Sequence, residues 1–363
     1  MAANTLELVL RTIKKYYEKI DGQLTAGKVG LDKFLFNTDD MDLSAQFALD
    51  KMIVNPHGVS FRKPGEQSHV RKFDNGTGHV YEVPHISEKT PITESDRDEI
   101  VAGLEAASSQ AQNAALRINK IITVHTAAHY MTRLKYAIDT LRTGKFTPLG
   151  MGGNDIGLEI DLAQDAGNDI TYDFTKSGAK INTALAEMFE VYRSQGGNMS
   201  DVVVVMGTSW YNNFFQDDDV SQWMGANTSN MLLEQSMRPT NFNNVDGLYR
   251  VATYRPGTVA AMDICQISLG NKFVPYLGGT AVDFFPATEA IMFSASAPRY
   301  RVFRGVDAVD MGRVQRAVGE IVFDSFIDND PVQEYIRTQT RVALIPANIN
   351  QVVRSTGTFP VVS

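Results

Sequence analysis

The sequence predicts an α+β fold whose longest parts do not fit inside one compact domain. Three observations lead to this prediction. Residues 93–142 carry a helical pattern of about fifty residues, which would extend roughly 75 Å. Before this pattern, residues 56–91 alternate short β-like pieces with glycine and proline. After it, residues 178–215 follow a helix–strand–helix order that is typical of an α/β core.

Composition limits the class of protein before any motif is considered. The chain has 363 residues, of which 43% are hydrophobic and 21% charged, as in ordinary globular proteins of one or two domains. No apolar run approaches the roughly 18 residues that span a membrane, and the N-terminus lacks a secretory signal. Cys265 is the single cysteine, so no disulfide forms within the chain and a reducing cytoplasm is expected. A net charge of −8 argues against a protein that grips nucleic acid, but it is compatible with a wall around nucleic acid.

Residues 1–55 are predicted to form an N-terminal arm. A helix is expected over residues 4–20, ended by Gly22, because apolar side chains recur on one face. So short a helix needs a partner surface to bury that face. Residues 23–55 show no long period and are predicted to be extended. The apolar face consists of Leu6, Val9, Leu10, Ile13, Tyr16, Tyr17 and Ile20.

Residues 56–91 are predicted to form a long β-hairpin. Pro64-Gly65 and Asp74-Asn75-Gly76 are strong turn signals between short strand candidates such as His79–Val83. The apolar content is too low for the segment to pack on itself, so we expect it to project from the molecule. Four basic residues flank the tip and could dock it on an acidic neighbour. They are Arg62, Lys63, Arg71 and Lys72.

The long helix has a clear start and stop. Thr93-Glu94-Ser95-Asp96 resembles a capping box, and Gly144 is a plausible end. Gly103 is the one glycine between Thr93 and Arg142, and it marks a potential break. An apolar stripe that includes His125 and His129 follows one face of the helix.

The rest of the chain is predicted to alternate helices and strands. A helix is expected over Ala179–Gln195, and the continuous apolar run from Asp201 to Met206 predicts a strand buried on both faces. Thr208 opens a third helix, which carries the aromatic cluster from Trp210 to Phe215. Further strands are expected at Tyr249–Tyr254, Phe273–Tyr276, Glu289–Phe293, Glu320–Phe326 and Thr340–Ile345.

The sequence shows no catalytic or metal-binding constellation, and we expect neither a catalytic site nor a cofactor. His125 and His129 have the i, i+4 spacing of a zinc motif, but no glutamate follows the first histidine, so a place in or beside the helix-packing stripe is favoured. Cys265 is expected to be a small buried side chain. The acidic runs at Asp39-Asp40, Asp42 and Asp217–Asp219 are expected at helix ends or in solvated loops. A hydrolase that uses the histidines remains the enzymatic alternative.

The order of these segments resembles the plan of the HK97-type capsid fold. The sequence itself is similar to the lambda-type family, often called the major capsid protein E family. The similarity is best from Met52-Ile53-Val54 through the basic hairpin to Val83-Pro84. It is also good at the C-terminal end, where Asp330-Pro331 and Glu334-Tyr335 precede the apolar strand Val342–Ile345, Pro346 and Asn348.

The resemblance implies a domain plan and a function. It assigns 1–55 to the N-terminal arm, 56–91 to the extended loop, 92–175 to the spine helix and peripheral domain, 176–310 to the axial domain and 311–363 to the peripheral return. The implied function is a major capsid protein that self-assembles into the icosahedral head of a tailed bacteriophage around double-stranded DNA. Arg62, Lys63, Arg71 and Lys72 in the loop and Tyr16 and Tyr17 in the arm would contact neighbouring subunits. An encapsulin-like compartment is the alternative within the fold, and a tail-tube subunit is disfavoured by the long helix.

The resemblance also implies partners. Pentamers and hexamers of the chain, a portal protein and packaged DNA bound without sequence preference are expected in the virion, with assembly in the host cytoplasm. The chain shows no charged helical prefix at its start, so a separate scaffolding protein is expected. Reinforcement of the shell is expected to be non-covalent, with a decoration protein as a further partner, and no membrane is involved.

Overall fold

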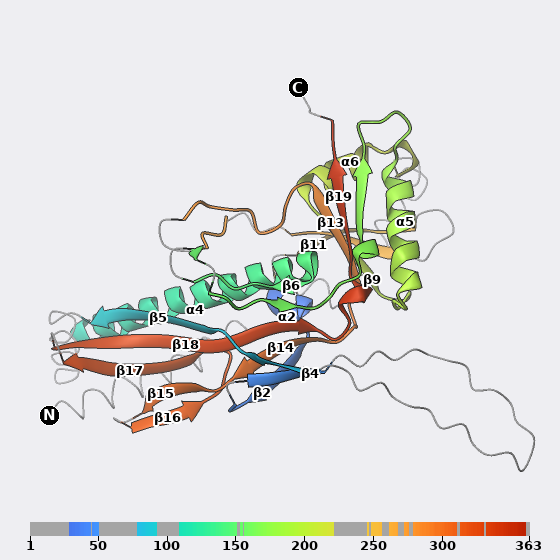
Figure 1. Cartoon of the computed structure of the whole chain (residues 1–363). Helices are drawn as coiled ribbons and strands as arrows, with labels where there is room; N and C mark the ends of the chain where they lie inside the picture. Colours follow the sequence, from blue (N-terminus) through green and yellow to red (C-terminus); the bar gives the residue numbers. More distant parts are fainter. Residues whose placement is uncertain are drawn as a thin grey trace, which may run out of the picture.

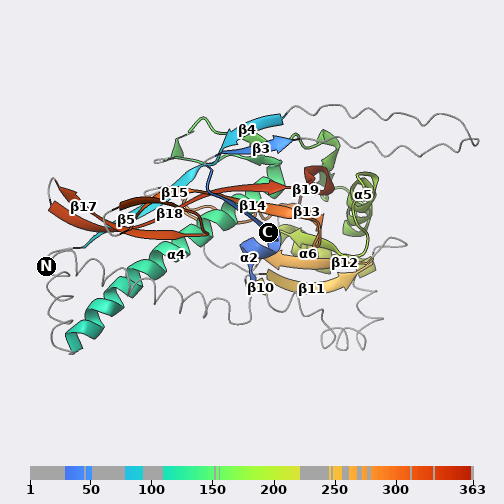
Figure 2. The ribbon, with the colours of Figure 1, turned by 90° about the horizontal axis from the view of Figure 1, so that it is seen from below.

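The computed structural model describes residues 29–44, 46–50, 78–92, 109–150, 153–154, 156–220, 245–246, 248–255, 261–267, 272–275, 279–310, 313–329 and 332–360. Two β-sheets dominate these residues (Figure 1). One sheet is elongated and lies along a long helix, and the other stands at one end of this layer with shorter helices on its face (Figures 1 and 2). The α+β class predicted from the sequence is confirmed.

The long helix, α4 (Ser109–Thr143), ends where the sequence predicts. Gly144 follows it with a φ of +66° and donates its backbone N–H to the Thr140 carbonyl, as expected for a glycine that closes a helix. A Cβ at this position would lie 2.7 Å from the Gln164 Cβ. The predicted start of the helix at residues 93–108 lies outside the described ranges.

The elongated sheet has five strands, and its central strand is β18 (Val332–Pro346), which has 15 residues. β17 (Val322–Asn329) and β5 (His85–Ile92) pair with its first half, and β14 (Arg299–Arg304) pairs with its second half, all antiparallel. β2 (Thr38–Asp42) joins β14 in parallel and forms the edge. Side chains from β18, such as Thr338, face α4, while alternate ones face the hairpin of β15 (Val306–Asp310) and β16 (Arg313–Ala317).

The second sheet has six strands in the order β11-β12-β9-β13-β19-β8. Its strands are β8 (Asp169–Asp173), β9 (Val202–Met206), β11 (Leu248–Tyr254), β12 (Met262–Ile267), β13 (Glu289–Ser294) and β19 (Val353–Thr358). α5 (Ile181–Ser194) and α6 (Thr208–Gln216) pack on it. Every residue of β9 is buried, as its continuous apolar run predicts.

Shorter elements connect these layers. α2 (Leu31–Leu35) follows β1 (Val29–Gly30), which pairs with β10 (Val245–Asp246). β3 (Gln46–Asp50) and β4 (Gly78–Glu82) form an antiparallel pair, so the arms of the predicted hairpin begin before residue 56. The remaining elements are β6 (Lys145–Phe146), β7 (Ile160–Asp161) and the single helical turns Ala166–Asn168 and Ile349–Gln351.

Several sequence expectations need correction. Phe273 forms only an isolated bridge with Val282, because the neighbouring residues make no ladder hydrogen bonds, so the strand expected at Phe273–Tyr276 is not formed in the described part. Residues 31–42 of the predicted extended arm form a helix and a strand. The strands β12, β14, β15, β16 and β19 were not predicted. The strand expected at Thr340–Ile345 is only the end of β18.

Candidate assembly surfaces

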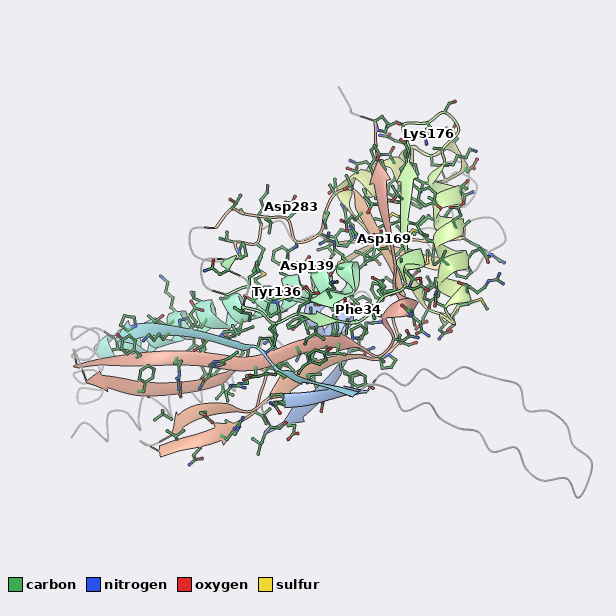
Figure 3. The ribbon with its side chains drawn as sticks, in the orientation of Figure 1. Phe34, Tyr136, Asp139, Asp169, Lys176 and Asp283 are labelled. Atoms are coloured by element: carbon green, nitrogen blue, oxygen red, sulfur yellow. The ribbon has the colours of Figure 1, made fainter. Side chains whose placement is uncertain are left out.

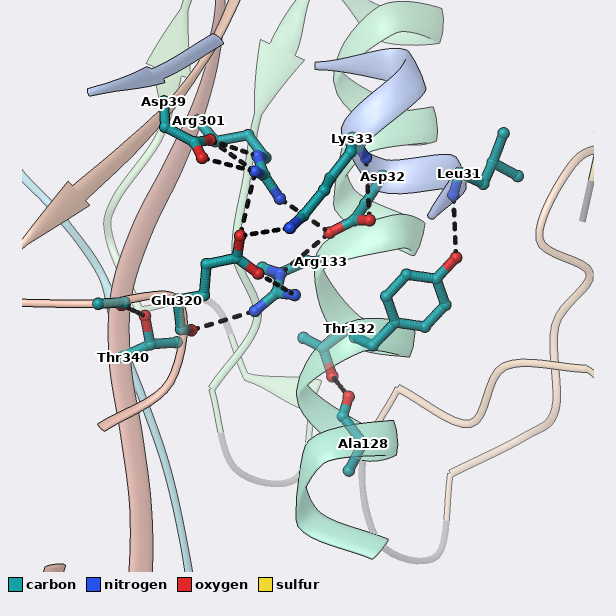
Figure 4. A network of polar contacts seen from close by, with 12 residues as sticks. Leu31, Asp32, Lys33, Asp39, Ala128, Thr132, Arg133, Arg301, Glu320 and Thr340 are labelled. Atoms are coloured by element: carbon teal, nitrogen blue, oxygen red, sulfur yellow. Dashed lines mark hydrogen bonds and ion pairs between the residues drawn. The ribbon is translucent and has the colours of Figure 1, made fainter. Parts of the chain in front are cut away.

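A network of buried charges fastens the N-terminal part of the described chain to α4 and the five-stranded sheet (Figure 4). The Asp32 carboxylate on α2 accepts hydrogen bonds from Arg133 Nε on α4 and Arg301 Nη1 on β14, both at 3.3 Å. Arg301 also donates two hydrogen bonds to Asp39 on β2, at 2.7 and 2.8 Å. The Asp32, Arg133 and Arg301 side chains are at most 4% exposed. Removing one of them would therefore leave an uncompensated charge in the interior.

Glu320, on the turn before β17, completes the charge balance of this network. Its carboxylate lies 2.9 Å from Lys33, 3.2 Å from Arg301 and 3.6 Å from Arg133. Burial alone would raise the pKa of Glu320, but the hydrogen bond from Lys33 and the charges of both arginines outweigh burial and lower it. Three cations thus meet three carboxylates where α2, β2, α4 and β14 converge.

A second set of contacts orients the base of the β3–β4 hairpin. The Arg304 guanidinium donates to the Asp40 carboxylate at 2.9 Å and to the Gln46 carbonyl at the start of β3 at 3.2 Å. On the other arm, Arg341 of β18 lies 3.4 Å from Glu82 of β4. Both arms of the β3–β4 pair are therefore tied to the five-stranded sheet. The structure corrects one expectation here: Asp39 and Asp40 lie in a strand and pair with arginines, not in a solvated loop.

A third cluster joins the end of α4 to the six-stranded sheet. Glu289 on β13 accepts two hydrogen bonds from Arg142 on α4, at 2.7 and 2.8 Å, and two from Arg354 on β19, at 3.2 and 2.9 Å. Burial alone would raise the pKa of Glu289, but both arginines outweigh burial and lower it. Asp139 pairs with Arg142, and Asp169 with Arg354. Figure 3 places these two carboxylates on either side of the junction.

The predicted histidine pair lies inside the fold. His125 and His129 are each 1% exposed and face β18 from α4. Both rings contact the Thr338 hydroxyl at 3.1 Å, through His125 Nδ1 and His129 Nε2. The prediction that they lie in or beside the helix-packing stripe is confirmed. No group of three or more metal-ligating side chains occurs within the described ranges.

Apolar side chains are exposed at several places on the described surface, among them the edge of β2 and the loops beside α4. Met41 on the edge strand β2 and Leu43 just after it are 47% and 52% exposed. Among the described strands, β14 alone pairs with β2, so β2 is an edge strand of this sheet. Leu149 and Ile156 are also exposed, on loops beside the second half of α4. Edges and apolar side chains of this kind are typical of surfaces that another chain covers.

Comparison with known proteins identifies the family. A sequence model of the family described as phage major capsid protein E matches residues 30–356. The chain belongs to this family. Among solved structures, a prophage capsid protein of Escherichia coli CFT073 shares the fold, with a TM-score of 0.54 and 14% identity over 94% of this chain and 98% of that chain. The mature capsid of bacteriophage PhiM1 aligns with a TM-score of 0.43 and 12% identity over 90% and 87% of the two chains. No curated protein sequence matches the chain.

Family membership confirms the resemblance inferred from the sequence. This member of the phage major capsid protein E family is a capsid protein of a virion, and the match favours that function over an encapsulin-like compartment. The HK97-like fold predicted from the order of segments is likewise confirmed. Among the described helices, none has a stretch both long and apolar enough to cross a bilayer.

The remaining residues of these surfaces and of the sequence expectations divide into three groups. Cys265 is fully buried, and Asp217 lies at a helix end, where it accepts the Ile181 N–H at 3.0 Å, so both expectations are confirmed. The expected contact residues of loop and arm lie outside the described ranges. They are Arg62, Lys63, Arg71, Lys72, Tyr16 and Tyr17. The third group was missed: the buried arginines of β14, for which the alternating pattern Arg299-Tyr300-Arg301 and the matching Asp39-Asp40 were the available signals.

Proposed function

We propose that this capsid protein assembles with copies of itself into the closed icosahedral head of a tailed bacteriophage and encloses double-stranded DNA. The match of the family model over residues 30–356 carries the proposal. The geometry supports it, because charged clusters fasten α2, β2 and the base of the β3–β4 pair to α4 and the five-stranded sheet. A subunit of this kind offers different surfaces on different sides, and such heterologous contacts close into rings.

The contacts between subunits are assigned to the two segments that the sequence singled out. Residues 51–77 connect β3 to β4 in the sequence, and their basic residues Arg62, Lys63, Arg71 and Lys72 would dock on an acidic part of a neighbour. Tyr16 and Tyr17 of the N-terminal arm would pack on another subunit. Because exposed ion pairs contribute only about 0–1 kcal/mol each, the basic residues would set register more than strength.

We refine the predicted domain boundaries from the strands that each sheet contains. β14, from the segment 176–310, joins the five-stranded sheet, and β19, from the segment 311–363, joins the six-stranded sheet. We therefore propose an axial domain of residues 169–294 and 353–358, with residues 29–44, 85–92 and 299–346 forming the peripheral domain along α4. The chain crosses between these two domains several times, which would make them move as a coupled pair.

The partners follow from this role. Pentamers and hexamers of the capsid protein would form the shell, with a portal protein at one vertex and a scaffolding protein present during assembly in the host cytoplasm. A decoration protein would be a further partner on the outer surface. With a net charge of −8, the wall would repel DNA weakly and would enclose it without sequence-specific binding. We propose no catalytic activity, cofactor or resident metal.

Light scattering of the purified chain, alone and with its scaffolding protein, tests this function. Closed assemblies many times heavier than the 40.1 kDa subunit are expected. A persistent monomer or small oligomer under both conditions would contradict the proposal. On a denaturing gel, mature shells should give a single band, and a ladder of covalent multimers would overturn the expectation of non-covalent reinforcement. Shells that carry a protein cargo and no DNA in infected cells would favour the encapsulin-like alternative.

Replacing residues 65–78 with a short Gly-Ser turn tests the hairpin. The circular dichroism spectrum and thermal melting should be retained, because the described contacts between the hairpin and the five-stranded sheet are made by Gln46 and Glu82, outside the replaced residues. Shells should be lost or aberrant. Normal shells with normal salt tolerance would contradict the assigned role, and so would a subunit that no longer folds.

A further inference from the structure

The interface between α4 and the five-stranded sheet contains a buried polar cluster that the proposed function does not use. His125 and His129 project from α4, one turn apart, onto Thr338 of β18. Thr90 of β5 closes the cluster, with its hydroxyl 2.7 Å from His125 Nε2. The apolar residues Ile122 and Ile336 are also buried, on α4 and β18, so the cluster has little access to solvent.

We assign the proton of neutral His129 to Nε2, because an N–H on the buried Nδ1 would find no acceptor among the described residues. A threonine hydroxyl has one proton and two lone pairs. Thr338 can accept the His129 Nε2–H and either donate to His125 Nδ1 or donate to the Glu88 carbonyl, 3.5 Å away. In both arrangements His129 Nδ1 carries a lone pair. That atom is buried and makes no hydrogen bond to any described residue.

A second proton on His129 would therefore be poorly accommodated. It would place an N–H on Nδ1, where no described acceptor lies, and a positive charge one turn from Arg133. Burial lowers the pKa of His129 to about 4, and the charges of Arg133, His125 and His85 act in the same direction. Burial also lowers the pKa of His125, and only the half-exposed Glu88 carboxylate, 4.0 Å away, opposes this.

The other charged groups around the cluster do not relieve this cost. Asp32 and Glu320 lie further along α4 and are engaged by Arg133. On the far face of the sheet, Asp324 pairs with Arg337, and Arg341 pairs with Glu82. Lys89 on β5 lies over the Tyr335 ring on that far face. His85 and Asp307 act on each other there, and His85 contacts Gln339.

We infer that His125, His129 and Thr338 form an acid-sensitive lock between α4 and β18. The lock is closed while both rings are neutral, and protonation favours a state in which α4 has lifted from β18 and the rings reach water. Since an exposed histidine titrates near pH 6.5, the closed state loses stability as pH falls below that value and until the ring of the closed state titrates near pH 4. The inference depends on the fold of one subunit and not on the proposed assembly. In a shell, a fall in pH would favour the open state of the lock in every subunit.

Hydrogen exchange of the α4 backbone between pH 7 and pH 4 tests the lock in the full-length chain. The exchange rates are first corrected for the intrinsic rate, which gives the opening constant of residues 122–133. For each unit by which pH falls, this constant should rise by a factor about ten times larger in the wild type than in His129→Gln, because the variant lacks one titrating group. Gln keeps a donor that can reach Thr338 but cannot be protonated. Thr338→Val is the matched control: it should raise opening by a constant factor at every pH. Equal pH slopes in the wild type and His129→Gln would overturn the inference.

A second measurement needs no variant. Exchange of the histidine C2 hydrogen, followed by mass spectrometry on the wild-type chain, reports the titration midpoint of each ring. The midpoint of His129 should lie below about 5, well under the ordinary histidine value of about 6.5. A midpoint at or above 6.5 would contradict the lock even if His129→Gln failed to fold.

Discussion

The two sheets of this capsid protein both bury apolar side chains but differ in the polar groups that are buried beside them. Around β9, α5 and α6, the interior is apolar: Val204, Met206, Trp210 and Phe214 are essentially unexposed. At the interface of α4 with the five-stranded sheet, the interior contains an ionic network, a histidine pair and threonines beside apolar side chains such as Leu134, Ile138 and Val342. Apolar packing tolerates replacement by side chains of similar shape. Buried charges require fixed partners and contribute little net stability. Apolar packing therefore stabilises both units, while the polar groups at the interface fix the position of α4.

Arg301→Ala should have the largest effect, because it leaves Asp32 and Asp39 without a shared partner. We expect a loss of about 3–5 kcal/mol in the free energy of unfolding, measured by urea denaturation of the unassembled subunit. Arg301→Lys should recover little, because a lysine cannot form the two parallel bonds to Asp39. Full recovery by lysine would show that charge alone matters at this position and would weaken the comparison.

Trp210→Ala should follow closely, with a loss of about 3–4 kcal/mol from the cavity in the apolar unit. Trp210 is fully buried, donates its indole N–H to the Thr288 carbonyl at 3.0 Å, and packs edge-on against Phe174 and Phe359. Here the conservative change should succeed, and Trp210→Phe should recover at least half of the loss. If both substitutions are equally damaging, the apolar unit is no more tolerant than the polar interface.

Glu289→Gln should have an intermediate effect that depends on pH. The lowered pKa of Glu289 means that its contribution is present above the ordinary carboxyl value of about 4.5 and is lost as pH falls through the folded-state value. At pH 7 the variant should lose about 2–3 kcal/mol, and thermal melting should show a shallower decline below pH 4.5 than in the wild type. If the melting temperature of the variant declines below pH 4.5 as steeply as that of the wild type, Glu289 does not bind Arg142 and Arg354 in its ionised form.

Gly144→Ala should have the smallest effect of the four. The positive φ costs an alanine about 1–2 kcal/mol, and the new Cβ would press on Gln164. The change should lower the melting temperature of the subunit without altering its pH dependence, since no charged partner is affected. If Gly144→Ala lowered the free energy of unfolding as much as Arg301→Ala, the end of α4 would tolerate substitution as poorly as the ionic network does.

The sequence predicted the apolar unit far better than the polar interface. The run from Val202 to Met206, the helix from Ile181 and the stop at Gly144 depend on local pattern, and each lies where expected. β14 was missed because three arginines in six residues indicate an exposed segment unless their partners are known.

Those partners come from distant parts of the chain, so local pattern cannot supply them. Asp39 meets Arg301 across 262 positions, and Thr338 meets His125 across 213. The i, i+4 spacing of His125 and His129 predicted a shared helix face and burial, but not the hydroxyl between them. The order of arm, hairpin, long helix and α/β core nevertheless indicated the family, because that order depends on the placement of elements and not on their contacts.

Cryo-electron microscopy of particles formed by the full-length chain with its scaffolding protein is the most direct test of the account. We expect closed shells with five-fold and six-fold clusters of subunits. In these shells the hairpin from β3 and β4 of each subunit should cross a neighbour, and α4 should lie along the five-stranded sheet. Small open oligomers, or closed particles in which the hairpin folds back on its own subunit, would contradict it.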